Sequence, residues 1–157
     1  MDISKKNTTY LTHNFHAYPA KFPPHIPEYF IKKYSKKNET ILDPFVGCGT
    51  TMVECKLLNR HGIGVDLNPI ATLVAKSKTT KLSKSDIKLI IEVLEKITNS
   101  IHKSNTISPP SIPDFYNRDH WFQKNVQIEL KCILKEIENV KDKKVQNFLK
   151  TAFSSII

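Results

Sequence analysis

The feature that most constrains the fold of this chain is a strand, a glycine loop, a helix and a second strand in direct succession. Residues 40–43 predict a short buried strand, which must end at Pro44 because proline has no N–H to donate inside a sheet. A helix is expected over residues 50–58 and a second strand over residues 61–66. Parallel strands need a crossover of this kind, so the segment predicts a βαβ unit in an α/β protein.

The flanks of this unit predict loops and helices. Prolines disfavour a helix in residues 1–23, whereas residues 25–34 have apolar residues at helical spacing. The expected apolar face of that helix consists of Ile26, Tyr29, Phe30 and Tyr34. Asn68-Pro69 opens a further helix, since proline is tolerated in a first turn.

Beyond residue 80 the apolar spacing is helical throughout. Ser83 and Asp86 resemble a capping box at the start of a long helix, and two more helices follow a Ser/Asn/Pro-rich linker over residues 103–114. The apolar stripes expected in these three helices are Ile87, Ile90, Ile91, Leu94, Ile97 and Ile101, then Phe122, Val126, Leu130, Ile133, Leu134 and Ile137, then Val145, Phe148, Leu149, Ala152, Phe153 and Ile156.

The charge of the chain is concentrated outside the glycine-containing segment. The 24 Lys and Arg residues exceed the 15 Asp and Glu residues by a net charge of +9, which favours a polyanionic partner. Residues 41–75 carry two basic and three acidic residues, so the excess lies in the two flanks. Only Arg60 and Arg118 are arginines, which favours phosphate contact over reading of base edges. The codon bias of an AT-rich genome is an equally good explanation for much of the lysine content and therefore of the charge.

Cysteine usage and hydropathy favour a cytoplasmic location. Cys48, Cys55 and Cys132 form no C-x-x-C pair, which argues against a disulfide framework or a structural zinc site. No apolar run approaches the ~20 residues of a membrane span, and the N-terminus lacks the apolar stretch of a signal peptide. We therefore expect reduced thiols and no membrane partner.

The glycine loop carries the strongest chemical signal. Gly47 and Gly49 allow a ligand to approach the backbone ahead of a helix N-terminus, and Asp66 ends the next strand 19 residues after Gly47. That spacing is close to the one at which a carboxylate accepts hydrogen bonds from ribose hydroxyls. A dinucleotide loop is disfavoured because Asp43 would repel a pyrophosphate, whereas it suits the ammonium and sulfonium of S-adenosylmethionine. A tight glycine turn without a ligand is the remaining alternative.

These residues resemble the motifs of a known family, the DNA amino-methyltransferases that act on N4 of cytosine or N6 of adenine. Residues 43–51 (DPFVGCGTT) look like motif I, residues 66–69 (DLNP) like motif II, and residues 15–24 (FHAYPAKFPP) like motif X, which helps to hold the methionine end of the cofactor. The resemblance implies an incomplete Rossmann-like methyltransferase fold. Residues 1–80 would be the cofactor-binding portion, and residues 81–157 a helical segment continuing into a missing catalytic half.

The resemblance implies S-adenosylmethionine as the cofactor and assigns residues to its site. Motifs I and II would contribute Asp43, Phe45, Gly47, Gly49, Thr50 and Asp66, and motif X would contribute Tyr18, Ala20, Lys21 and Phe22. For Tyr18 and Phe22, simple packing on the sheet is the competing interpretation. His13, His16 and His25 are expected to be solvated or hydrogen-bonded rather than metal ligands, because no cysteine or acid is grouped with them.

The catalytic motif of this family has no clear match. Motif IV is an Asp/Asn/Ser-Pro-Pro-aromatic tetrapeptide after a strand, and the one weak candidate is Ser108-Pro109-Pro110, which is followed by Ser111 instead of an aromatic residue. We expect this segment to be a linker. Trp121 and Phe122 could stack on bases, but their helical spacing favours a place in the core.

The function implied by the resemblance is methyl transfer from S-adenosylmethionine to an exocyclic amine of double-stranded DNA, in a restriction–modification system. Without motif IV the chain alone would be inactive, as a truncated form or as half of an enzyme completed by a second polypeptide. An RNA methyltransferase fragment and a non-catalytic cofactor-binding or assembly subunit are the alternatives. In the latter, an exposed sheet edge would favour pairing with a partner.

Overall fold

A parallel strand pair, as predicted, is central to the first of two units in this computed structural model, residues 1–81 and residues 82–157. The structure describes residues 7–19, 21–103 and 112–157. The elements of the first unit in chain order are α1 (His25–Tyr34), β1 (Thr40–Asp43), α2 (Thr50–Leu57), β2 (His61–Gly64) and α3 (Pro69–Thr79). The second strand is two residues shorter than predicted.

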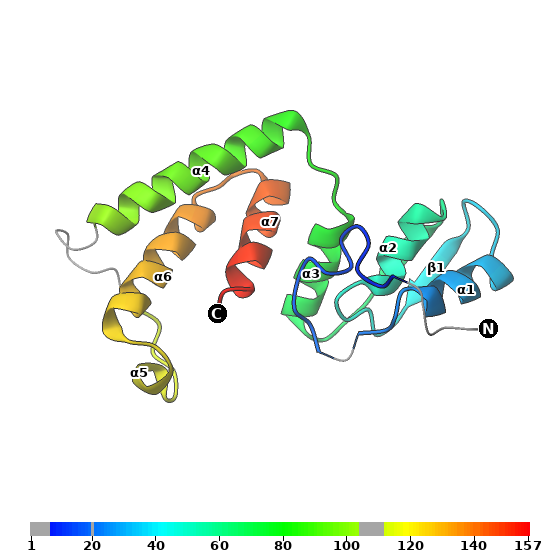
Figure 1. Cartoon of the computed structure of the whole chain (residues 1–157), viewed down its shortest axis with the longest axis horizontal. Helices are drawn as coiled ribbons and strands as arrows, with labels where there is room; N and C mark the ends of the chain where they lie inside the picture. The colour runs from blue at the N-terminus through cyan, green and yellow to red at the C-terminus, as the bar shows by residue number, and fades with distance from the viewer. Residues whose placement is uncertain (1–6, 20, 104–111) are drawn as a thin grey trace. The chain divides into compact units, whose positions relative to one another are not determined.

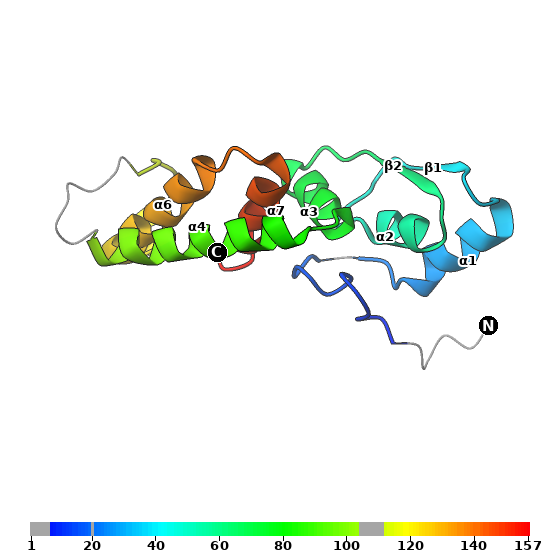
Figure 2. The same ribbon diagram turned by 90° about the horizontal axis from the view of Figure 1, so that it is seen from above.

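Helix α2 is the crossover that makes the strands parallel. Thr40 lies opposite His61 and Asp43 opposite Gly64, so the carboxyl ends of both strands meet at one edge. α2 packs on both strands, and α1 and α3 both pack against α2, with the strands on one side of this helical layer (Figure 2). The buried core between them consists of Ile31, Val46, Met52, Cys55 and Ala75.

The two glycines of β2 allow α2 to lie close to the sheet. A Cβ atom on Gly62 would lie 2.7 Å from Sδ of Met52, and one on Gly64 would lie 2.5 Å from Cγ2 of Val46. Real Cβ atoms do not approach other atoms so closely. A side chain at Gly64 would therefore need Val46 of the loop to move, whereas one at Gly62 would displace the flexible end of the Met52 side chain.

The apolar face predicted for α1 is not the buried one, because none of its four predicted residues is buried. Ile31 and His25 are buried, whereas Phe30 and Tyr34 are 53% and 69% exposed. Helical periodicity finds the apolar stripe but does not say which part of it a neighbour covers. Here α1 packs on α2, and three of the residues predicted to be inside, Ile26, Phe30 and Tyr34, line a cavity of about 510 Å³ beside β1.

The second unit is helical, as predicted. Its elements are α4 (Lys84–Lys103), α5 (Arg118–Trp121), α6 (Lys124–Glu138) and α7 (Lys143–Ser154). α4, α6 and α7 pack pairwise (Figure 1) around a core of Val93, Ile97, Ile137, Val140, Val145 and Leu149. The predicted capping box is present, because Ser83 Oγ accepts from the Asp86 N–H at 3.2 Å and Asp86 Oδ2 accepts from the Ser83 N–H at 2.8 Å.

Two predictions for the second unit are wrong. Ile87, Ile91 and Leu94 on α4 are about half exposed, because α6 and α7 cover the neighbouring stripe that contains Val93. Trp121 was expected in the core but is 70% exposed.

The candidate Ser108-Pro109-Pro110 lies outside the described residues. Within the described segments, no helix has the length and apolar character that crossing a membrane requires.

Candidate functional site

The loop after β1 is held in a conformation that only glycine adopts readily. Gly47 and Gly49 have φ angles of 48° and 82°, in the left-handed region. A Cβ on Gly49 would lie 2.6 Å from Cβ of Ala75 on α3, so the loop packs directly on that helix. At the start of the loop, Oδ1 of Asp43 accepts a hydrogen bond from the Phe45 N–H at 3.1 Å.

Asp66 joins the loop to the end of β2. Its Oδ2 accepts from the Gly47 N–H at 2.9 Å, and its Oδ1 accepts from the Asn68 N–H at 2.9 Å. These backbone hydrogen bonds, led by that of Asn68, lower the pKa of the carboxyl below its usual value. Each oxygen retains a lone pair, so the carboxylate can still accept hydrogen bonds from hydroxyl groups of a ligand.

Two aromatic residues predicted for the site come from different segments, Phe45 from the glycine loop and Tyr18 from the N-terminal segment. The Tyr18 ring lies beside Gly47, where a Cβ would be 3.7 Å from its Cε1. Phe45 projects from the loop and is 85% exposed. The structure therefore brings Tyr18, Phe45 and Asp66 together around Gly47, although simple packing remains a sufficient role for Tyr18.

The remaining predicted residues line cavities on either side of Phe22. A cavity of about 330 Å³ is lined by Lys21, Phe22 and Thr50, together with Thr8, Thr9, His13, Asn14, Pro23 and Pro24. Asp43 lies instead in the 510 Å³ cavity beside β1, which Phe22 also lines. Ala20 lies outside the described residues.

Sequence reasoning missed a polar network beneath the loop. Glu54 of α2 is buried, and its Oε1 contacts Nε2 of His13 at 2.8 Å and accepts from the Tyr10 hydroxyl. Lys78 is also buried and donates to Sγ of Cys48 at 3.6 Å, and burial lowers the pKa of its ammonium. A carboxylate among the apolar residues of a short helix was the available signal.

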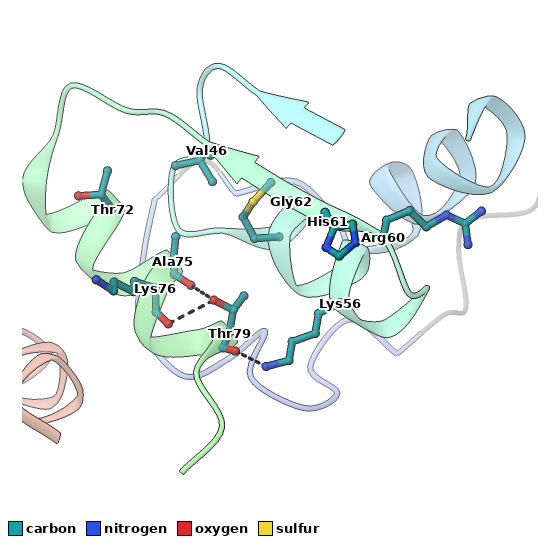
Figure 3. A pocket seen from close by; sticks show the side chains of 11 residues that line it. Val46, Lys56, Arg60, His61, Gly62, Thr72, Ala75, Lys76 and Thr79 are labelled. Carbon is teal, nitrogen blue, oxygen red and sulfur yellow. Dashed lines mark hydrogen bonds between the residues drawn. The ribbon is translucent and has the colours of Figure 1, made fainter. Parts of the chain in front are cut away.

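A separate cavity of about 500 Å³ contains none of the predicted site residues. It is bordered by α2, β2 and α3 (Figure 3), and four basic side chains line it, Lys56, Arg60, His61 and Lys76. Two of its cations bind carbonyl oxygens of the same unit: Lys56 donates to the Thr79 carbonyl oxygen, and Arg60 donates to the carbonyl oxygens of Ser35 and Leu58. These two side chains therefore connect elements of the first unit.

The arrangement around Gly47 has the chemistry of a nucleoside-binding site. The loop and Asp66 follow the carboxyl ends of two adjacent parallel strands, where α/β sheets bind ligands. A carboxylate with free lone pairs fits ribose hydroxyls, and the carboxylate of Asp43 is compatible with a cationic ligand. In the described parts of the chain, no group of three or more His, Cys, Asp or Glu residues could hold a metal ion.

Comparison with known proteins places these motifs in a family. The N6/N4 DNA methylase family model matches residues 2–77. The Type II methyltransferase M.MvaI of Kocuria varians is 32% identical over 96% of this chain, and M.HpaI of Haemophilus parainfluenzae is 31% identical over 87%. M.MjaII of Methanocaldococcus jannaschii is 37% identical over 62% of the chain. No solved structure matches.

The matched relatives are much longer than this chain. It spans 35% of M.MvaI, 42% of M.HpaI and 18% of M.MjaII. The family model covers the segment that contains the glycine loop, Asp66 and the N-terminal segment packed on α2. The chain belongs to the DNA amino-methyltransferase family.

Proposed function

We propose that this chain binds S-adenosylmethionine as part of a DNA methyltransferase of a Type II restriction–modification system. The reaction would transfer a methyl group to an exocyclic amine of adenine or cytosine. The names of the relatives and the family model support this assignment. The first unit would then be the cofactor-binding part of a Rossmann-like methyltransferase domain, and the helical second unit would continue toward its catalytic half.

The observation that carries the proposal is the Asp66–Gly47 hydrogen bond. It links the ends of two adjacent strands through a loop with left-handed glycines, and it leaves lone pairs of the carboxylate available. When bound, S-adenosylmethionine supplies an activated methyl group on its sulfonium. Asp66 would hold the ribose, Gly47 and Gly49 would admit the ligand to the backbone, and Phe45 and Tyr18 would provide apolar contact.

Residues of motif X and the start of α2 would hold the amino-acid end of the cofactor. Lys21, Phe22 and Thr50 line one cavity. The Lys21 ammonium and the Thr50 hydroxyl would suit the carboxylate of the cofactor's methionine end. Asp43 would face the cationic groups of the ligand. Ala20 belongs to the same proposed set through its place in the motif.

Isothermal titration calorimetry with S-adenosylmethionine tests the cofactor assignment. The wild-type chain should bind, and Asp66→Asn should weaken binding about tenfold or more, since one charged acceptor of a ribose hydroxyl is worth about 1.5–3 kcal/mol. Asp114→Asn is the matched control because Asp114 is exposed and lies in the second unit. No binding by the wild-type chain, or equal binding by Asp66→Asn, would contradict the proposal.

Transfer of a tritiated methyl group distinguishes the candidate substrates. The 157-residue chain alone should bind the cofactor without methylating double-stranded DNA, and transfer should require a polypeptide that supplies motif IV and target recognition. Methylation of DNA by the chain alone would refute the proposal that catalysis and target recognition need another polypeptide. Transfer to tRNA but not to DNA would favour an RNA methyltransferase.

A further inference from the structure

Glu54 is a buried carboxylate that the cofactor site described above does not use. It is 2% exposed on α2, one turn after Thr50, which lines the 330 Å³ cavity. A buried carboxylate is costly unless hydrogen bonds satisfy it. Both of its described partners, Tyr10 and His13, come from the N-terminal segment more than 40 residues earlier in the chain.

These contacts anchor the N-terminal segment on α2. The described part of residues 7–24 forms turns without a helix or strand. His13 is as deeply buried as Glu54, and the Tyr10 and His13 rings meet edge to face at 4.7 Å. Burial, followed by the hydrogen bond to Glu54, raises the pKa of Tyr10, so the phenol stays protonated and donates. Thr12 adds one hydrogen bond to the Lys78 carbonyl oxygen of α3 at 3.0 Å.

The same segment forms one wall of the proposed cofactor site. His13 and Thr50 both line the 330 Å³ cavity, and the Lys21 ammonium donates to the His13 carbonyl oxygen at 3.3 Å. Displacing His13 from Glu54 would therefore displace Lys21 and the residues that follow it. The cavity exists only while the N-terminal segment is docked on α2.

We propose that Glu54 is a positioning residue that makes cofactor affinity depend on docking of the N-terminal segment. It holds the wall of the site through Tyr10 and His13 and touches no cofactor itself. This inference rests on the proposed function, because it assumes that the cavity receives part of S-adenosylmethionine. Linkage then requires that cofactor binding also strengthens docking of the segment.

The test combines cofactor affinity with hydrogen–deuterium exchange of the full chain. Glu54→Gln removes the charge but keeps the shape, and Glu54→Leu removes the acceptor while preserving the helix. Both variants should raise the Kd for S-adenosylmethionine, by about tenfold to a hundredfold for Glu54→Leu, which is ~1.4–2.8 kcal/mol. Glu39→Gln is the matched control, since Glu39 is an exposed carboxylate of the same unit.

Exchange rates separate positioning from a general loss of structure. In the variants, amides of residues 8–19 should exchange faster while those of β1, α2 and β2 keep their wild-type rates, and saturating cofactor should slow residues 8–19 in the wild type. An unchanged Kd, or faster exchange throughout the unit, would overturn the inference; if Glu54→Leu fails to fold, Tyr10→Phe provides the same test. If the wild type binds S-adenosylmethionine and the variants bind it with the same Kd, only this inference is refuted. If the wild type does not bind it, the proposed function is refuted as well.

Discussion

Replacing Gly49 by alanine should destabilise the first unit far more than the same change at Gly47. Gly49 has a φ of 82°, and an alanine Cβ there would lie 2.6 Å from Cβ and 2.7 Å from Cα of Ala75. The left-handed conformation costs an alanine about 1–2 kcal/mol, and overpacking against a fixed backbone costs about 1–3 kcal/mol. Together they predict a loss of about 2–5 kcal/mol in the free energy of unfolding.

Gly47 is the matched comparison because it shares the conformation without the collision. Its φ is 48°, and the nearest side-chain atom to a Cβ would be Tyr18 Cε1 at 3.7 Å, an ordinary contact. Gly47→Ala should therefore cost only the conformational part, about 1–2 kcal/mol. Hydrogen exchange of peptides from residues 40–79 in increasing urea measures this unit separately from the second. Equal losses for the two variants would refute the steric argument.

Four further predictions concern buried or exposed groups elsewhere in the chain. Ser83→Ala should cost the second unit about 1 kcal/mol of stability through the lost cap. Hydrogen bonds from Lys144 and Ser83 lower the pKa of Asp86 to about 2. The ionised Asp86 should therefore stabilise the folded state fully above its unfolded pKa of about 3.9, and this contribution should be lost as the pH falls toward 2. Acid unfolding of Asp86→Asn should lack this pH dependence. Burial lowers the pKa of Lys78, so the folded state loses this proton at a lower pH than the unfolded state does, and the stability of the first unit should rise as pH increases toward about 10.4. Lys78→Met should lack this rise, and a pH profile identical to that of the wild type would contradict the prediction. Trp121→Ala should change stability by less than about 0.5 kcal/mol, whereas Leu149→Ala, at a residue 4% exposed, should cost about 2–5 kcal/mol in the same denaturation experiment; similar losses would show that Trp121 is packed.

Local signals predicted the parts of the fold that depend on neighbouring residues. Asn68 accepts from the Ile70 N–H at 2.9 Å and caps α3, whose first residue is the expected proline. Ser83 and Asp86 cap α4 reciprocally, as their spacing predicts. Because each of these contacts spans two or three residues, the sequence contains all the information that determines them.

Contacts between distant residues were not predictable in the same way. The proximity of Asp66 to Gly47 could be expected because parallel strands end at one edge, and the 2.9 Å hydrogen bond confirms that geometry. The His13–Glu54 contact crosses 41 residues and involves a loop without periodicity, so no local pattern indicates it. Exposure of Trp121 likewise depends on which face of a short helix its neighbours leave uncovered.

The missing side chain of Gly64 lets the glycine loop lie directly against β2. Gly64 is not among the proposed cofactor-binding residues, yet a Cβ atom there would lie 2.5 Å from Cγ2 and 2.9 Å from Cβ of Val46. A single methyl group at this position would push Val46, and with it the neighbouring Gly47, away from the strand. The place of the loop in the proposed binding site thus depends on a strand residue that no ligand would touch.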